Sequence, residues 1–239
     1  MRERYFPVVL ILIFFAMSLT AITGGFFYYQ HYEKQYLTRV ENELSAIAEL
    51  KIHDIGQWRK ERLGDASIFY QNKLFSKIVK RCMPEFNDAD ARRTIIEWLQ
   101  KLETYDQYDQ IRLLDTEGNK VLAIPDSDIP ISLSIRQHIP GVLSDGQIYF
   151  QDIFQSDVDN EIRMALIIPL FDADTPQKPL GILALRIDPF RYLYPFIQRW
   201  PTPTNTAETL IARRDGNDAL FLCELKFVKD SALKLRIPL

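Results

Sequence analysis

The feature that most constrains this chain is an uncharged run of 25 residues, from Tyr5 to Tyr29. About 20 apolar residues in helical form cross the hydrocarbon core of a bilayer, so the run predicts a transmembrane helix. Arg2 and Arg4 precede it, and the positive-inside tendency places this short amino terminus in the cytoplasm. The predicted location is therefore the inner (cytoplasmic) membrane, with residues 31–239 periplasmic or extracellular.

A cleaved signal peptide is the alternative interpretation of the same run. Its apolar stretch is usually about 7–15 residues long and ends at small residues that mark the cleavage site. This run is longer, and no clear Ala-x-Ala signal follows it. The pattern favours an uncleaved anchor, and both interpretations export the rest of the chain.

Residues 31–83 are predicted to form a long amphipathic stalk helix that ends at Pro84. Its apolar residues step by three and four, as in Leu37, Val40, Leu44 and Ile47. A helix that continues to Lys80 has about 50 residues and a length of roughly 75 Å. A helix of that length must pair with another copy or lie along a domain, so we expect a homodimer through this helix.

Residues 84–200 predict one α+β unit. A capped helix through Thr94–Leu102 comes first, and a short helical piece lies at Ile135–Ser144. Short connectors separate the strand candidates, which predicts antiparallel neighbours with helices on one side. The expected strands are Gln110–Asp115, Val121–Ile124, Gln147–Phe154, Glu161–Phe171 and Leu180–Asp188.

A second unit of the same kind is expected to begin after a stiff linker at Pro201–Thr206. Thr209–Leu222 repeats the strand, Asp-Gly turn and strand of the first unit. Only 24 residues follow Asp215, so residues 201–239 are interpreted as the linker and an incomplete second unit.

The order of these elements resembles a double Cache sensor region of bacterial membrane receptors. The resemblance implies a transmembrane helix (1–30), a stalk, a PAS-like sensor unit (84–200) and a partial second PAS-like unit. It also implies ligand sensing in a receptor of histidine kinase or diguanylate cyclase type, whose output domain is absent from this sequence, so no enzymatic activity is assigned. The segments that carry it are Ile55–Ala66, Asp115–Gly118, Ile168–Phe171, Leu180–Pro189, Leu193–Pro201 and Ala207–Gly216.

Composition and motifs remove several other classes of function. The net charge of −3 and the lack of a basic stripe argue against nucleic acid as a partner. Three histidines without a ligand cluster, and no glycine-rich phosphate loop, give no metal or cofactor site. Cys82 and Cys223 are interpreted as independent buried thiols, and Asp172 with Asp174 as a solvated turn. A membrane-tethered interaction protein or an inactive remnant remains the alternative, whereas an exported hydrolase lacks a nucleophile–base set.

Strand alternation locates a candidate ligand site, because successive side chains point to opposite faces of a sheet. Phe150 and Phe154 are expected on an apolar face, opposite the mixed face on which Ala165 and Ala184 leave space. A small carboxylate would suit the arginines there. The alternative is a solvated face whose arginines pair with Asp152 or Asp188. The candidate ligand-binding residues are Tyr149, Gln151, Arg163, Arg186 and Asp188.

Overall fold

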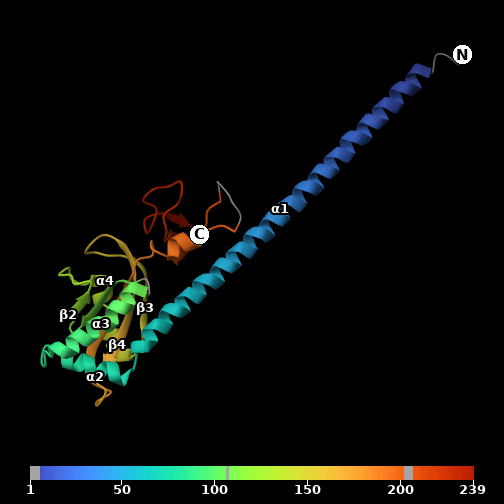
Figure 1. Cartoon of the computed structure of the whole chain (residues 1–239). Coiled ribbons are helices and arrows are strands. Elements are labelled where there is room, and N and C mark those ends of the chain that lie inside the picture. The colour runs from blue at the N-terminus through green and yellow to red at the C-terminus, as the bar shows by residue number, and fades with distance from the viewer. Residues whose placement is uncertain (1–5, 106–107, 202–206) are drawn as a thin grey trace. The chain divides into compact units, whose positions relative to one another are not determined.

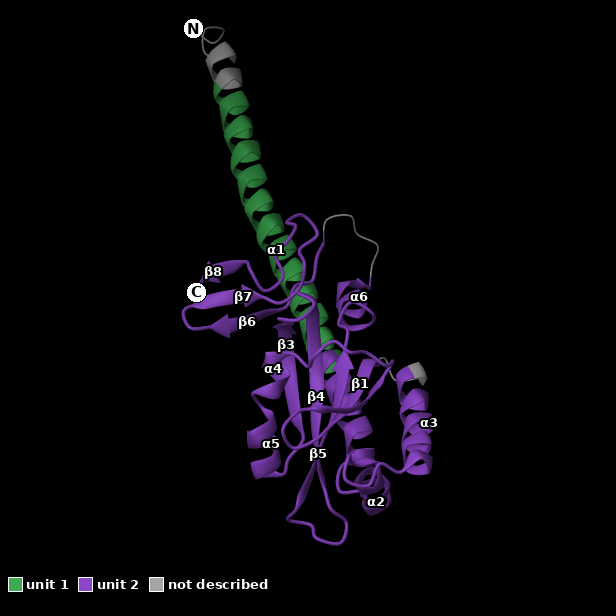
Figure 2. Cartoon of the chain, turned by 90° about the vertical axis from the view of Figure 1, so that its left-hand side faces the viewer, with its two compact units in different colours: residues 1–54 green, residues 55–239 purple. Residues whose placement is uncertain are grey.

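The structure of the chain is a computed structural model that describes residues 6–105, 108–201 and 207–239. It divides into two compact units, residues 1–54 and residues 55–239 (Figure 2). The first unit is the amino-terminal part of one long helix. The second unit holds both sheets and the remaining helices.

Helix α1 runs from Phe6 to Phe69 (Figure 1). It contains residues 6–29 of the uncharged run, and its part from Leu12 is long and apolar enough to cross a membrane. The hydroxyls of Thr20 and Thr23 donate to the carbonyl oxygens of Ala16 and Leu19, at 2.8 and 2.7 Å, so these polar atoms are satisfied within the helix. The predicted long apolar helix is confirmed, and its capacity to cross a membrane rests on its length and composition.

The stalk helix ends earlier than the sequence pattern predicted. Helix α1 stops at Phe69, and a second helix, α2, spans Lys73–Cys82. Gln71 has a φ of 55°, and the side chain of Asn72 accepts hydrogen bonds from the backbone N–H groups of Leu74 and Phe75, both at 3.1 Å. Asparagine is a strong helix N-cap, so the chain turns here and starts a new helix. The domain boundaries at 83/84 and 200/201 stay predictions.

The five-stranded antiparallel sheet is confirmed, with the strand order β2-β1-β5-β4-β3. Every neighbouring pair is antiparallel, as the short connectors predicted. The sheet places β5 at its centre, and β5 pairs with β1 on one side and β4 on the other. The strands are β1 (Tyr108–Leu114), β2 (Lys120–Ile124), β3 (Tyr149–Gln155), β4 (Ile162–Phe171) and β5 (Pro179–Ile187).

Helices cover both faces of this sheet, which corrects the prediction of helices on one side (Figure 2). The last turns of α1, with α2 and α3 (Ala89–Tyr105), pack on the face that carries Leu166 and Leu185. Helices α4 (Leu133–Arg136) and α5 (Ile139–Asp145) pack on the opposite face, against Ile167 and Ile182. Both faces are apolar at the centre of the sheet, so both need a cover that excludes water.

A second, three-stranded sheet has the order β6-β7-β8. Strands β6 (Ala212–Asp215) and β7 (Asp218–Phe221) form the hairpin that the Asp-Gly turn predicted, and β8 (Arg236–Pro238) adds a strand that was not foreseen. Helix α6 (Leu193–Gln198) precedes this sheet in the chain. The phenol of Tyr194, in α6, donates a hydrogen bond to the carbonyl oxygen of Leu222, which follows β7. Most of the expected linker, residues 202–206, lies outside the described residues.

The two cysteines are free and buried, as predicted. Cys82, the last residue of α2, packs in the core, where burial raises the pKa of its thiol to about 11. Burial also raises the pKa of the Cys223 thiol. Neither thiol therefore has the thiolate character that a reactive cysteine needs.

Candidate ligand pocket

A pocket lies between the second face of the sheet and the segment that enters α4. It measures about 390 Å³ with its solvent-open mouth, but only about 20 Å³ of it admits a water molecule. Its apolar wall consists of the segment Ile129–Ile131 with Ile135, Phe154, Val158 and Ala184. Its polar wall consists of Gln110, Arg112, Ser132, Ser156, Arg163 and Arg186.

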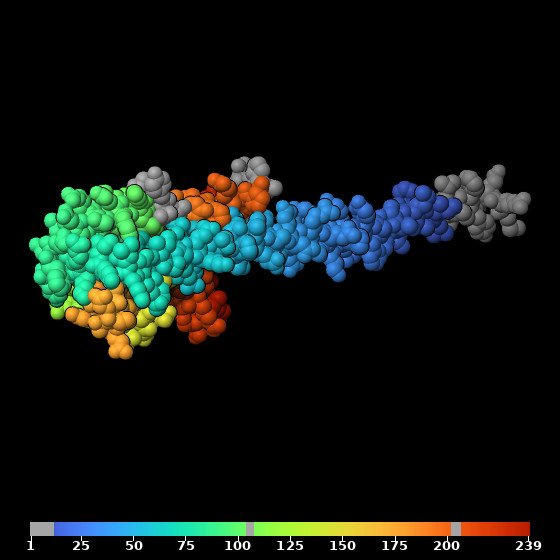
Figure 3. Space-filling model, turned by 60° about the horizontal axis from the view of Figure 1, so that its bottom comes forward, coloured from blue at the N-terminus to red at the C-terminus, as the bar shows by residue number. Residues whose placement is uncertain are grey.

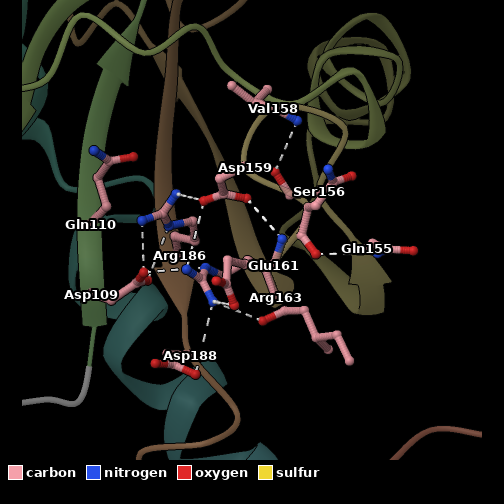
Figure 4. Close-up of polar contacts among 12 residues, drawn as sticks. Asp109, Gln110, Gln155, Ser156, Val158, Asp159, Glu161, Arg163, Arg186 and Asp188 are labelled. Carbon is pink, nitrogen blue, oxygen red and sulfur yellow. Dashed lines mark hydrogen bonds and ion pairs between the residues drawn. The ribbon is translucent and has the colours of Figure 1, made fainter. Parts of the chain in front are cut away.

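Arg186, on β5, is held by a two-point ion pair with Asp109, on β1. Its Nε donates to Oδ1 at 3.1 Å, and its Nη2 lies 2.7 Å from Oδ2 (Figure 4). Its Nη1 also lies 3.5 Å from Oδ2 of Asp159. A fork-shaped contact of this kind fixes the guanidinium plane, so Arg186 is firmly positioned.

Arg163, on β4, is held loosely by comparison. Its Nη1 donates to the carbonyl oxygen of its neighbour Ile162 at 3.0 Å. Its nearest carboxylate oxygens belong to Asp109, 3.4 Å from Nε, and Asp159, 3.6 Å from Nη2. Glu161 and Asp188 lie farther away, 3.9 and 4.0 Å from Nη1. The buried Nε makes no hydrogen bond within the described part of the chain. Arg163 is therefore surrounded by carboxylates without a fixed partner.

Arg112, on β1, is a buried cation without a counterion. Arg112 is only 6% exposed to solvent. Its Nε donates a hydrogen bond to Oε1 of Gln110 at 2.7 Å. Within residues 6–105, 108–201 and 207–239, its two terminal nitrogens make no hydrogen bond or ion pair. Burial and the nearby Arg186 charge lower the pKa of Arg112, but arginine keeps its proton in proteins.

Small neighbours give Arg112 its space. In the register of the sheet Arg112 lies opposite Ala123 on β2 and Ala184 on β5. Neither methyl group fills the volume beside the guanidinium. The backbone pairing thus places an arginine between two alanines, with its free end at the pocket.

Arg112 differs from the other two arginines because no carboxylate lies beside it. Arg163 and Arg186 lie within ion-pair distance of Asp109 and Asp159, and Arg163 is also 3.9 Å from Glu161 and 4.0 Å from Asp188. Burial alone would raise the pKa of Asp159, but a hydrogen bond from Ser156 and the two nearby arginines hold the pKa below its usual value. Asp159 is therefore ionised at neutral pH and stays paired with Arg163 and Arg186, whereas Arg112 has no ion-pair partner among the described residues.

The predicted site residues fall into two groups. Arg163 and Arg186 both line the pocket, whereas Asp188 does not line it and lies 4.0 Å from Nη1 of Arg163. Tyr149 and Gln151 do not line it. Tyr149 stacks on His138 with ring centres 4.4 Å apart, and Oε1 of Gln151 is buried without a partner in the described chain.

Two details of the predicted face are corrected by the strand geometry. A register shift between Gln151 and Phe154 breaks the alternation of β3, so Phe154 joins the second face and lines the pocket. The arginines pair mainly with Asp109 and Asp159, not with Asp152, which lies 3.5 Å from Arg213. Of the two alanines expected to leave space, Ala184 lines the pocket and Ala165 is buried in the second core.

Sequence reasoning missed Asp109, Gln110 and Arg112. Gln110 and Arg112 had a usable signal, because the alternation of the predicted strand 110–115 places them on one face. The other residues of the site, Asp159 and the segment 129–132, lie in loops, whose sequences have no hydrophobic periodicity. Nothing in their local sequence ties them to the strands that they meet.

No family model matches this sequence, and no curated protein matches it. Solved structures do match. The ligand-binding domain of the Pseudomonas fluorescens chemoreceptor CtaA, in complex with L-leucine, superposes with a TM-score of 0.53 at 13% identity, over 81% of this chain and 72% of that one. The ligand-binding domain of the Pseudomonas aeruginosa PAO1 amino acid chemoreceptor PctC, in complex with GABA, gives a TM-score of 0.50 at 14% identity, over 82% and 80%.

The sensor domain of the V. cholerae histidine kinase DctB also matches, with a TM-score of 0.49 at 14% identity. The match covers 62% of this chain and 55% of that one, so this chain spans about half of the DctB domain. The superpositions on CtaA and PctC show that the chain shares the fold of these chemoreceptor ligand-binding domains. The predicted resemblance is confirmed at the level of the fold.

Proposed function

We propose that the chain is the extracytoplasmic ligand-sensing region of a membrane-bound signal-transduction receptor. Its fold is that of sensor domains, and its amino-terminal helix has the length and composition of a membrane span. The single observation that carries the proposal is the free end of Arg112, a buried cation on a pocket wall. A buried charge without a partner lowers the stability of the fold. Proteins keep such a residue at functional sites, where a bound ligand supplies the missing partner.

The ligand is a small anion, and a carboxylate fits best. Arginine offers two parallel N–H donors to a carboxylate, and both terminal nitrogens of Arg112 are available. The pocket lining supports the same choice, because it holds three guanidinium groups and, among the described residues, no carboxylate. CtaA and PctC were solved with L-leucine and GABA, each of which carries a carboxylate.

Ligand binding requires the outer wall to move, because the closed pocket admits little more than a water molecule. That wall is the segment Ile129–Ser132, in which Ile129 is 49% exposed. Its polar tie is the carboxylate of Asp157, which accepts from the Ser132 hydroxyl and, at 2.9 Å, from the backbone N–H of Leu133, while Ile131 packs in the second core. Opening of the wall therefore requires release of the Asp157 contacts and movement of Ile131, and it leaves the strand pairing unchanged.

The same proposal includes a homodimer through α1. Leu37, Val40, Leu44 and Ile47 repeat at the spacing that two paired helices use, and Leu37 and Leu44 are 58% and 50% exposed. A ligand that favours one arrangement of the paired helices would shift the population toward it. Leu44→Cys should therefore form a cross-linked dimer in membranes, whereas Glu43→Cys, one position away from the stripe, should not.

In receptors of kinase or cyclase type a separate output domain performs the catalysis, and we assign no catalytic step to this region. The competing interpretation is a membrane-tethered interaction protein, which would show no response to small molecules. The two interpretations differ in the pocket alone. An experiment on the pocket therefore separates them.

The test is a thermal-shift series on the full chain in nanodiscs with a panel of short carboxylates and amino acids. At least one compound should raise Tm in a concentration-dependent way, and Arg112→Gln and Arg163→Ala should both remove the rise. Arg93→Gln is the matched control, because the ion pair of Arg93 with Asp90 lies on the exposed surface of α3, outside the pocket lining. A rise that survives in Arg112→Gln, or no rise with any compound, would overturn the proposed function.

A further inference from the structure

The chemistry of the pocket wall selects among carboxylates. Three guanidinium groups line the pocket, and its described lining contains no aspartate or glutamate. The carboxylates closest to these groups already lie beside arginines: Asp109 is bound by Nε and Nη2 of Arg186, and Asp159 lies beside Arg186 and Arg163. Glu161 and Asp188 lie 3.9 and 4.0 Å from Nη1 of Arg163 and are not part of the lining. Asp157, at the outer wall, is committed to Ser132 and Leu133.

This arrangement is unfavourable for an α-amino acid. The ammonium group of a zwitterion is attached to the carbon that bears its carboxylate. If the carboxylate binds Arg112, the ammonium therefore enters the same cluster of cations. It would find no free carboxylate in the lining, so it would be desolvated without a partner and repelled by the arginines. The cluster of arginines that attracts the carboxylate of an anion repels the ammonium group of a zwitterion.

The rest of the pocket wall indicates the chemical character of the other end of the ligand. It is formed by the apolar segment Ile129–Ile131 with Ile135, Phe154 and Val158. Ser132 and Ser156 are the polar exceptions. Ser132 is bound to Asp157, and the hydroxyl of Ser156 accepts from the backbone N–H of Val158 at 3.4 Å. The tail of the ligand therefore meets hydrocarbon on most sides.

We infer that this pocket takes short aliphatic monocarboxylates, anchored on Arg112, and rejects the α-amino acids of the same carbon skeleton. The inference rests on the proposed function and narrows it. Arg112 is available because the one hydrogen-bond partner of its side chain among the described residues, Gln110, is neutral. An acidic residue at position 110 would form an ion pair with Arg112 inside the protein. That ion pair would compete with the binding of an anionic ligand.

The test compares matched pairs on the full chain in nanodiscs: propionate against L-alanine, and isovalerate against L-valine. Each pair shares a carbon skeleton and differs only by the ammonium group. Thermal shift and calorimetric titration at constant ionic strength should show binding of one or both carboxylates and none of the amino acids. Gln110→Glu, nearly isosteric, should weaken the carboxylate by about tenfold or more, because Arg112 gains a charged partner.

The outcomes separate the inference from the proposed function. If an amino acid binds as well as its partner carboxylate, and Arg112→Gln abolishes both, the inference is wrong and the proposed function stands. If carboxylates bind equally to wild type and to Gln110→Glu, Arg112 is not the anchor and the inference is wrong. If no compound of either class binds while a different small molecule raises Tm through Arg112, the inference again fails alone. Arg112→Gln that unfolds the chain would not hide the result, because Gln110→Glu keeps every side-chain volume.

Discussion

Tyr108 donates a hydrogen bond from its buried phenol to Oδ2 of Asp65 at 3.0 Å, and this contact joins the first residue of β1 to the last turns of α1. Arg62 reinforces it, because its Nη2 lies 3.2 Å from the same oxygen and its guanidinium carbon lies 5.5 Å from the centre of the Tyr108 ring. The next residue along β1 is Asp109, the partner of Arg186. Two successive strand residues therefore contact the helix on one side and the pocket charges on the other.

Tyr108→Phe should lower the stability of the domain while the fold persists. The substitution removes one hydrogen bond to a carboxylate and keeps the ring, so we expect a loss of about 1.5–3 kcal/mol. For a domain of this size, that corresponds to a fall in Tm of several degrees. The control is Tyr192→Phe, at a tyrosine that is 37% exposed and stacks on Phe196. Equal Tm values for the two variants would show that the Asp65 contact contributes nothing.

Gly181→Ala should abolish folding, whereas Gly141→Ala should be tolerated. Gly181 has a φ of 149°, and a Cβ there would lie 2.0 Å from the carbonyl oxygen of Leu114 on the neighbouring strand. Backbone cannot yield by that amount, so we expect a loss of about 4 kcal/mol or more. Gly141 lies in α5 with no atom within 4 Å of its added Cβ, and alanine there should stabilise the helix by up to about 1 kcal/mol. Urea unfolding of both variants measures the difference, and a folded Gly181→Ala would contradict the close approach of β1 and β5.

The turn after β4 is tied to α2 by an ion pair that should make stability depend on pH. In Figure 3 the turn around residue 175 projects from the surface beside α2. Lys80 lies 2.7 Å from Asp172, whose side chain is 3% exposed, so this turn is not simply solvated as its sequence suggested. The hydrogen bond from Lys80 lowers the pKa of Asp172, and the same bond raises the pKa of Lys80.

Lys80→Met should therefore lower Tm at pH 7 more than Lys77→Met does. Lys77 lies 3.9 Å from Asp174 with both side chains largely exposed, which makes it the matched control. A carboxyl whose folded pKa is depressed contributes stability above its unfolded pKa of about 3.9 and loses it as pH falls through the lower folded value. The excess effect of Lys80→Met should thus persist from about pH 5 to 9 and shrink below about pH 3. Thermal unfolding across pH tests this, and a constant difference would exclude the ion pair as its cause.

The sequence predicted what depends on periodicity and missed what depends on contacts between distant segments. Alternation in β4 and β5 placed Arg163 and Arg186 on one face, because strand geometry fixes side-chain direction locally. It failed at Phe154, because a register shift in β3 is a property of the paired strands. The break at Asn72 was missed because the apolar stripes of α1 and α2 serve the same core and read as one helix. Asp159 reaches the arginines from a turn, where no periodic signal exists.

Arg112→Met provides the last prediction, and it separates a binding residue from a structural one. Methionine fills the space of the stem and removes a buried cation that has only Gln110 as a partner. Replacement of a buried charge by an apolar side chain of similar volume is often stabilising by about 1–4 kcal/mol, so the ligand-free variant should have a raised Tm and no response to carboxylate. Arg186→Met should do the opposite, because it leaves the carboxylate of Asp109, 7% exposed, without its two-point partner and should cost about 3–5 kcal/mol. Thermal unfolding of both variants in the absence of ligand measures the difference. If Arg112→Met destabilises the domain as Arg186→Met does, the charge of Arg112 stabilises the fold, and Arg112 is not the ligand-binding residue of the pocket.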